Sequence, residues 1–174
     1  LLLMAGPCVL ESGDLALAYN VVGSYAVTRL PDASDIEVIE PEDFTVALLR
    51  TAFGSVAREA GDLSAGVYDT KGRMLAQAVT GTPGHVNTMA VAVGHFLERF
   101  PLEGLVAGDV LVTNDPWMGT GHLFDFVVVT PVFVGQRPVA LFASTCHTID
   151  VGGRGFTADA ASVYEEGTCI PHLK

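Results

Sequence analysis

The sequence predicts an α+β fold in which antiparallel hairpins pack with two helices. Apolar residues recur at helical spacing in two segments, residues 44–60 and 86–100. Shorter apolar runs bounded by turn residues occupy much of the remaining length, and two pairs of these runs have the spacing of β-hairpins. Helices and antiparallel hairpins in one chain are typical of the α+β class.

The first five predicted elements are, in chain order, helix 44–60, strand 63–68, strand 73–79, helix 86–100 and strand 110–113. An acidic segment, Pro41-Glu42-Asp43, begins the first helix, and Gly61 ends it. The turn Asp69-Thr70-Lys71-Gly72 joins the first two strands. Pro101 ends the second helix, because its ring cannot continue one.

A second hairpin is predicted from the apolar runs 126–134 and 138–145, which Gly135-Gln136-Arg137 separates. If these three residues form the loop, counting outward from it places Asp125 opposite His147. Cross-strand neighbours have Cβ atoms about 5 Å apart. A two-residue loop would instead shift the pairing by one residue and place Asp125 opposite the neighbouring cysteine.

His122 lies three residues before Asp125, so the hairpin predicts a metal site formed by His122, Asp125 and His147. Two imidazoles and a carboxylate suit manganese, iron or zinc and leave coordination positions open for water or substrate. Cys146 is expected on the opposite face of the strand from His147. The alternative is that His147 and Asp125 only cap strand ends and bond to local backbone.

Six longer motifs occur between about Pro41 and Leu173. They are Glu59–Asp69, Gly72–Ala78, Gly84–Met89, Gly108–Val110, Asn114–Asp125 and Glu165–Pro171. These motifs, in this order, resemble the hydantoinase B/oxoprolinase family. This family includes the B subunit of N-methylhydantoinase, subunits of acetone and acetophenone carboxylases, and the C-terminal half of 5-oxoprolinase. The run Gly119-Thr120-Gly121-His122 and the single histidine His147 are closer to the N-methylhydantoinase and ketone-carboxylase branches than to 5-oxoprolinase.

The resemblance implies a cofactor and a partner. In the carboxylase relatives the metal is manganese, held by a histidine, an aspartate three residues later and a further histidine, which correspond to His122, Asp125 and His147. The family also implies an A-type subunit that uses ATP to activate a cyclic amide or imide, or a ketone, in a hetero-oligomer. The alternative is a truncated, non-catalytic remnant that binds an A-type subunit.

Three further residues are candidates for catalytic or supporting roles. Asp115 follows a predicted strand and precedes Pro116, and is either a turn residue or an acceptor that orients a ligand imidazole. Asp150 is either a metal ligand or the residue that holds His147 in one tautomer, and the second role is favoured. His85 lies in a loop before the second helix and, within its family motif, is a candidate for contact with the small-molecule substrate.

Composition limits the function classes. The chain has 174 residues, 49% of them hydrophobic, and a formal net charge of −11. This charge argues against nucleic-acid binding, which needs a basic face, and against anionic membrane surfaces. Three cysteines are an odd number without framework spacing, so they predict reduced thiols and a cytoplasmic location.

Two domains are expected. Residues 39–174 form the hydantoinase B-like region, truncated at its C-terminus, and residues 1–38 remain unassigned. Leu1–Ser12 resembles the opening strand of a sugar-phosphate synthase barrel, but nothing downstream supplies the other strands. The tail of an A-type half and a mis-joined reading frame are the other interpretations.

Overall fold

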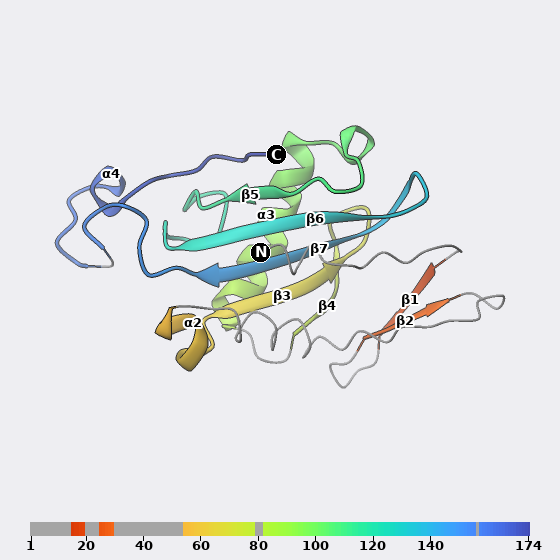
Figure 1. Cartoon of the computed structure of the whole chain (residues 1–174), viewed down its shortest axis with the longest axis horizontal. Helices are drawn as coiled ribbons and strands as arrows, with labels where there is room; N and C mark the ends of the chain where they lie inside the picture. The colour runs from red at the N-terminus through yellow and green to blue at the C-terminus, as the bar shows by residue number, and fades with distance from the viewer. Residues whose placement is uncertain (1–14, 20–24, 30–53, 79–81, 156) are drawn as a thin grey trace.

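A five-stranded antiparallel sheet forms the centre of the protein (Figure 1). The computed structural model describes residues 15–19, 25–29, 54–78, 82–155 and 157–174. The strands in spatial order are β4 (Met74–Gln77), β3 (Leu63–Tyr68), β7 (Arg137–His147), β6 (Asp125–Val134) and β5 (Leu111–Thr113). All neighbouring strands run antiparallel, and helices accompany them, so the predicted α+β class is confirmed.

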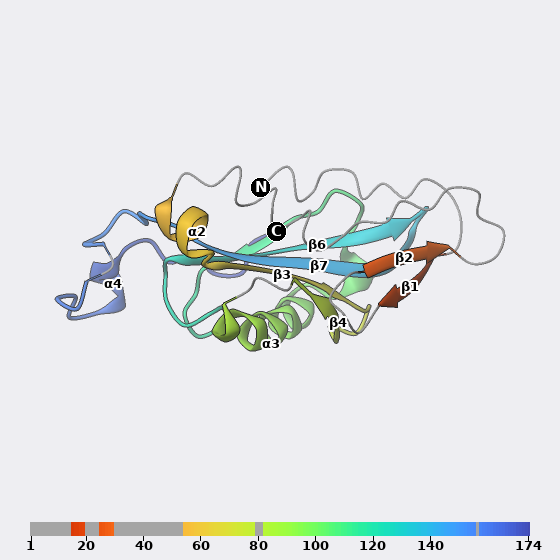
Figure 2. The ribbon, with the colours of Figure 1, turned by 90° about the horizontal axis from the view of Figure 1, so that it is seen from below.

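One long helix, α3 (Pro83–Arg99), lies along one face of this sheet (Figure 2). The shorter helical segments are α2 (Ser55–Ala60), the 3-10 turn η1 (Leu102–Gly104) and α4 (Val163–Glu166). A separate hairpin pairs β1 (Leu15–Tyr19) with β2 (Tyr25–Arg29). Among the described residues, no helix is both long enough and apolar enough to cross a bilayer.

The predicted first helix, residues 44–60, lies only partly within the described chain. Residues 55–60 are helical as α2, and residues 44–53 lie outside the described residues. The helix ends as predicted at Gly61, which adopts a left-handed conformation with φ of 68°. Glycine tolerates this conformation because it has no Cβ atom.

The core fills the space between α3 and the sheet. Met89, Val93 and Phe96 project from the helix and are fully buried. The buried cluster that they join comprises Tyr68, Met89, Ala92, Val93, Phe96, Leu105, Leu111, Val127, Val129, Leu141 and Ala143. Burying one such large apolar side chain contributes about 1.5–3 kcal/mol, so this cluster fixes the position of α3 on the sheet.

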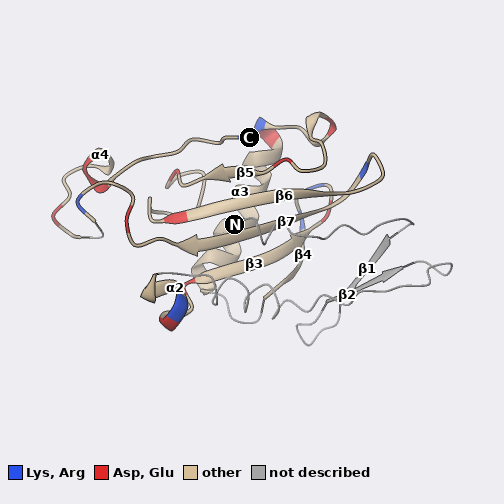
Figure 3. Cartoon of the chain, in the orientation of Figure 1, with Lys and Arg blue, Asp and Glu red and all other residues tan. Residues whose placement is uncertain are grey.

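Charge is nearly absent from the middle of the sheet. Asp125 is the only charged residue of β6, Arg137 is the only acidic or basic residue of β7 apart from its terminal histidine, and β3 has none. In Figure 3 the coloured positions accordingly lie in loops, in helices and at strand ends. Charged side chains on these three strands are therefore confined to strand ends.

The β6–β7 hairpin has the predicted pairing of Asp125 with His147 but reaches it differently. Val134 pairs with Arg137, so the loop is the two residues Gly135 and Gln136 and not the three predicted. A β-bulge then leaves Val139 without a cross-strand partner and shifts the register by one residue. The extra residue in the bulge compensates for the residue missing from the loop, so Asp125 still pairs with His147.

Helix α3 begins three residues earlier than predicted. Its first residue is Pro83, which suits this position because its fixed φ matches a helix and the first amides need no intrahelical partner. His85, which the sequence predicted to lie in a loop, therefore belongs to the first turn of α3. The helix end at Arg99, just before Pro101, agrees with the prediction to within one residue.

The loop between β5 and β6 is held by Asn114, which is fully buried. The Asn114 side-chain amide donates hydrogen bonds to the carbonyl groups of Leu123 and Thr168, each at 2.8 Å. Its carbonyl oxygen accepts a hydrogen bond from the Ile170 amide at 2.5 Å. One side chain thus ties the start and the end of the loop to the C-terminal segment.

Candidate metal centre

The candidate site lies at the edge of the sheet where β6 begins and β7 ends. Asp125 is the first residue of β6 and His147 the last of β7, and both are buried. Strand alternation places both side chains on the same face as Val127 and Ala143, which is the face that α3 covers. The site is therefore sheltered by the first turn of α3.

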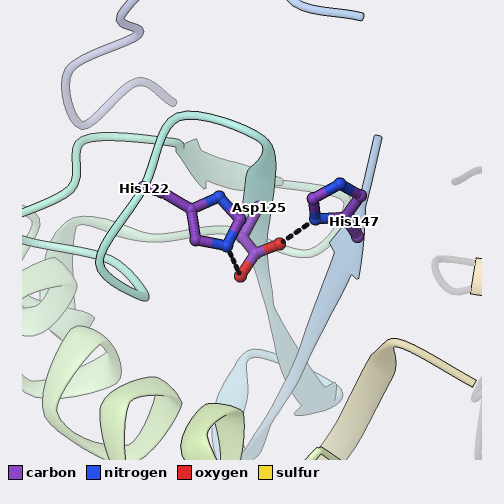
Figure 4. A group of neighbouring side chains, drawn as sticks. All are labelled: His122, Asp125 and His147. Carbon is purple, nitrogen blue, oxygen red and sulfur yellow. Dashed lines mark hydrogen bonds and ion pairs between the residues drawn. The ribbon is translucent and has the colours of Figure 1, made fainter. Parts of the chain in front are cut away.

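Asp125 and two histidines lie in direct contact (Figure 4). The Asp125 Oδ1 atom is 3.0 Å from His147 Nδ1, and the Oδ2 atom is 3.1 Å from His122 Nε2. The Thr120 hydroxyl donates a hydrogen bond to Oδ2 at 2.9 Å. The His147 ring stacks on Phe124 with centroids 5.6 Å apart, which fixes its orientation. These contacts place the three side chains in one compact group.

This group fits a divalent metal ion. His122, Asp125 and His147 each offer a ligand atom, and these atoms all lie within 4.8 Å of one another. Two nitrogen atoms and one carboxylate oxygen form a donor set typical of manganese, zinc or iron sites. A fully buried carboxylate is also costly unless it is paired, and a cation compensates that cost.

Protonation in the site follows from the same contacts. Burial alone would raise the pKa of Asp125, but hydrogen bonds from His122 and His85 and their positive charge lower it well below its usual range. The hydrogen bond with Asp125 raises the pKa of His122, and burial opposes this effect. Asp125 therefore stays ionised at neutral pH, as a metal ligand must.

His85 joins the group from α3. Its Nε2 atom lies 2.8 Å from Asp125 Oδ2, and the side chain is only 7% exposed. The structure thus brings one of the three further candidates into direct contact with a predicted metal ligand.

Asp62 also lies in the site, although the sequence reasoning did not single it out. Its Oδ1 atom lies 3.5 Å from His85 Nε2, and its Oδ2 atom lies 3.6 Å from His147 Nδ1. Strand β3 pairs with β7 so that Leu63 faces Cys146, and Asp62 follows as the next residue outward, beside His147. The position of Asp62 directly before a predicted strand could have indicated a site residue. Placing it beside His147, however, requires knowing that β3 pairs with β7.

The other two candidates make contacts within their own loops. Asp115 accepts a hydrogen bond through Oδ1 from the Trp117 amide at 2.9 Å, which is the geometry of a turn. Asp150 is exposed and accepts a hydrogen bond through Oδ1 from the Gly152 amide at 2.7 Å. Two carboxylates of the described residues lie close to His147 Nδ1, that of Asp125 at 3.0 Å and that of Asp62 at 3.6 Å.

The chain resembles proteins of known function over most of its length. A 5-oxoprolinase of Saccharomyces cerevisiae is 34% identical over 128 residues, covering 71% of this chain and 10% of that protein. Caprolactamase subunit beta of Pseudomonas jessenii is 30% identical over 135 residues, covering 76% of this chain and 23% of the subunit. The chain therefore spans a quarter or less of the length of these relatives.

A third relative extends the similarity toward the N-terminus. The 5-oxoprolinase of Dictyostelium discoideum is 32% identical over 172 residues and covers 94% of this chain, but this is only 13% of the length of that enzyme. Residues 39–174 make up a smaller share of the chain than the 94% that this match covers. The match therefore also includes part of the first 38 residues.

Solved structures show the same fold. The nucleotide-free structure of acetone carboxylase superposes with a TM-score of 0.62 at 23% identity, over 74% of this chain and 17% of that one. The ATP-dependent caprolactamase of Pseudomonas jessenii superposes with a TM-score of 0.57 at 26% identity, over 79% of this chain and 26% of that one. The family model "Hydantoinase B/oxoprolinase" matches residues 40–174. The chain belongs to the hydantoinase B/oxoprolinase family.

Proposed function

We propose that this chain carries the metal-binding part of a catalytic B-type subunit in an ATP-dependent amidohydrolase or a related ketone carboxylase. The observation that supports this proposal is the contact of the buried Asp125 with His122 and with the buried His147 at one end of the sheet. Family relatives act as oxoprolinase, caprolactamase and acetone carboxylase, so an enzyme that acts on cyclic amides or imides, or on activated ketones, fits the site.

The proposed cofactor is a divalent cation, and manganese is preferred over zinc or iron. His122 Nε2, His147 Nδ1 and an oxygen of Asp125 are the atoms that would hold it. When bound, such an ion polarises a carbonyl or enolate oxygen, or lowers the pKa of a bound water toward about 7.

The residues around the ligands have distinct roles in this proposal. Phe124 fixes the plane of the His147 ring by stacking, and the Thr120 hydroxyl orients the Asp125 carboxylate. His122 is 30% exposed, whereas Asp125 is fully buried, so substrate is expected to approach from the His122 side. Asp115 shapes the loop that carries His122, and Asp150 shapes the loop after β7.

The proposal includes an A-type partner that uses ATP to activate the substrate in a hetero-oligomer. The relatives named as caprolactamase subunit beta and as the acetone carboxylase of an ATP-dependent carboxylation support this arrangement. We also propose a cytoplasmic location, where the free thiols of Cys146 and Cys169 remain reduced. Residues 1–38 are proposed to end a preceding A-type half, because the similarity to the Dictyostelium enzyme extends into them.

Metal content tests the proposal most directly. The protein purified without chelators is expected to hold manganese, and His147→Ala and His122→Ala are expected to lose it, because each removes a ligand. His95→Ala is the matched control, since His95 lies outside the ligand group and contacts the Met118 carbonyl at 3.3 Å. Full metal occupancy in His122→Ala would contradict the assignment. No metal in the parent protein would favour the non-catalytic alternative.

A further inference from the structure

We propose that Ser64, Tyr68 and Thr145 hold one buried water molecule between helix α3 and the sheet. The inference is independent of the proposed function, because none of the three residues belongs to the groups that could ligate a metal. The three side chains are at most 1% exposed. Within the described part of the chain, none of their hydroxyl oxygens has a hydrogen-bond partner. Three polar atoms thus lie inside the layer that packs α3 on the sheet.

The three hydroxyl groups share the face of the sheet that α3 covers (Figure 2). Tyr68 and its cross-strand partner Leu141 belong to the core cluster beneath α3. Strand alternation places Ser64 and Thr145 on the same face. Ser64 and Thr145 are direct cross-strand partners on β3 and β7, and the Cβ atoms of such partners are about 5 Å apart. The serine and threonine hydroxyls therefore lie within reach of a single bridging molecule.

Gly66 allows the Tyr68 hydroxyl to approach this pair. A Cβ atom at Gly66 would lie 3.2 Å from Tyr68 Cε2 and 3.4 Å from Tyr68 Oη, so the tyrosine ring lies over the glycine. Gly66 stands between Tyr68 and Ser64 on this face, and its cross-strand partner Ala143 carries only a methyl group. No bulky side chain of β3 or β7 therefore separates the three hydroxyl groups.

The hydrogen-bonding capacity of the three groups matches one water molecule. Burial raises the pKa of Tyr68, so its phenol stays protonated and can donate a hydrogen bond. The hydroxyl oxygens of serine and threonine can each accept one. A water molecule that accepts from Tyr68 and donates to Ser64 and Thr145 makes three hydrogen bonds. Buried waters typically make about three, to polar groups that would otherwise be unsatisfied.

Packing alone does not account for hydroxyl groups at these positions. Valine and phenylalanine fill nearly the same space as threonine and tyrosine without burying a polar atom. A buried hydroxyl without a partner has lost its bonds to bulk water, and this loss destabilises the fold. Most buried polar side chains in proteins are therefore bonded to protein or to ordered water. Three such hydroxyls on neighbouring positions favour one shared polar ligand.

The water would connect two strands that are distant in the sequence. The β3–β7 pairing starts with Leu63 opposite Cys146, and Ser64 opposite Thr145 is the next pair. A water bonded to both hydroxyls adds a side-chain connection to the backbone hydrogen bonds there. Its third bond, to Tyr68, joins this connection to the core beneath α3.

The first test is the sign of a stability change. Thr145→Val and Tyr68→Phe each remove a hydroxyl and keep the shape of the side chain. Because each hydroxyl bonds to the water, the folding equilibrium constant should fall about 2- to 10-fold in urea denaturation. Tyr164→Phe is the matched control, since Tyr164 is 88% exposed, and should leave the constant unchanged. An increase in both buried variants would overturn the inference, because removing an unpaired buried hydroxyl stabilises a protein.

The second test counts long-lived internal waters by magnetic relaxation dispersion of the water oxygen nucleus. The double variant Ser64→Ala/Thr145→Val should lose the contribution of one water relative to the parent. Ser162→Ala is the control and should match the parent, because Ser162 is exposed and its side chain makes no capping hydrogen bond. An unchanged dispersion in the double variant, beside a fall in stability, would show that the hydroxyls bond to protein groups and would overturn the inference. Both tests are made without added metal, so their outcome is separate from that of the proposed function.

Discussion

Two carboxylates at opposite ends of the same sheet show two ways of stabilising a negative charge. Asp69 follows β3 at the turn end, and its carboxylate accepts hydrogen bonds from the amides of Lys71 and Arg73 and from the Arg73 guanidinium. Asp125 begins β6 at the other end and is surrounded by imidazoles from α3, β7 and the preceding loop. The first carboxylate is stabilised by its own turn, and the second by the loop before it together with two segments distant in the sequence.

The comparison distinguishes a carboxylate that stabilises the fold, Asp69, from one that belongs to a candidate binding site, Asp125. The Asp69 contacts lie within five consecutive residues and stabilise a hairpin turn. The Asp125 contacts bring together polar groups that are expensive to bury. Polar groups that are gathered at such cost are typical of binding sites.

The largest effect is expected from Asp125→Asn. The variant keeps the shape of the side chain but removes the negative charge that faces His122 and His147. Manganese affinity should fall at least about 100-fold, because the loss of supporting residues alone lowers metal affinity 10–100-fold. Isothermal titration calorimetry measures the change, and affinity within a factor of about two of the parent would contradict the metal assignment.

The apolar core in the middle of the sheet lies between these two ends. The Leu141→Ala substitution tests how much this core contributes to stability. Leu141 is fully buried in the cluster beneath α3, so its truncation leaves a cavity. The free energy of unfolding should fall by about 2–5 kcal/mol. Urea denaturation measures this loss. Manganese affinity of the folded variant should stay close to that of the parent, because Leu141 lies six residues before His147 on β7.

At the turn end, Asp69→Ala should cost about 1–2 kcal/mol of unfolding free energy, because the amides of Lys71 and Arg73 lose their shared acceptor. Metal binding should not change. A loss of metal affinity in this variant would show that the two ends of the sheet are coupled.

The charge of Asp69 also gives a pH dependence with a defined sign. Burial alone would raise the pKa of Asp69, but the hydrogen bonds from Arg73 and Lys71 and the charge of Arg73 lower it. A lowered pKa in the folded state contributes stability above the unfolded pKa of about 3.9, and that contribution is lost as the pH falls through the folded value. The stability difference between the parent and Asp69→Asn should therefore be constant near neutral pH and shrink in acid.

The smallest effect is expected from Arg73→Ala. The guanidinium is 2.6 Å from Asp69 Oδ2, but the Arg73 side chain is 74% exposed, so solvent screens the pair. The loss should be about 0.5 kcal/mol or less. Thermal unfolding at low and high salt checks this: a larger loss, or one that salt does not reduce, would contradict the surface character of the pair.

Contacts between neighbouring segments of the sequence could be predicted, and contacts between distant segments could not. The β3–β4 and β6–β7 hairpins could be predicted because each joins neighbouring apolar runs through turn residues. The pairing of Asp125 with His147 followed from the second hairpin. The loop length was predicted wrongly, because the bulge at Val139 cannot be distinguished from a longer loop by counting residues.

The remaining part of the site depends on pairing between distant segments. Strands β3 and β7 are separated by more than sixty residues in the sequence, and nothing local indicates that they pair. Asp62 was missed for this reason. The position of His85 was predicted only as a loop residue, because the start of α3 at Pro83 was placed too late. Its contact with Asp125 follows from the packing of α3 on the sheet.

The bulge at Val139 also determines where β7 can gain or lose a residue without changing the pairing of Asp125 with His147. Deleting Val139 would make β7 regular and leave Asp125 opposite His147, because Ala140 would still pair with Val132. Deleting one residue between the bulge and His147, such as Ser144, would move the next residue into register and bring Thr148 opposite Asp125. Insertions and deletions are therefore expected to be tolerated toward the hairpin tip and selected against between the bulge and the histidine. Loop grafting or the fusion of a reporter peptide would accordingly be directed to Gly135 and Gln136.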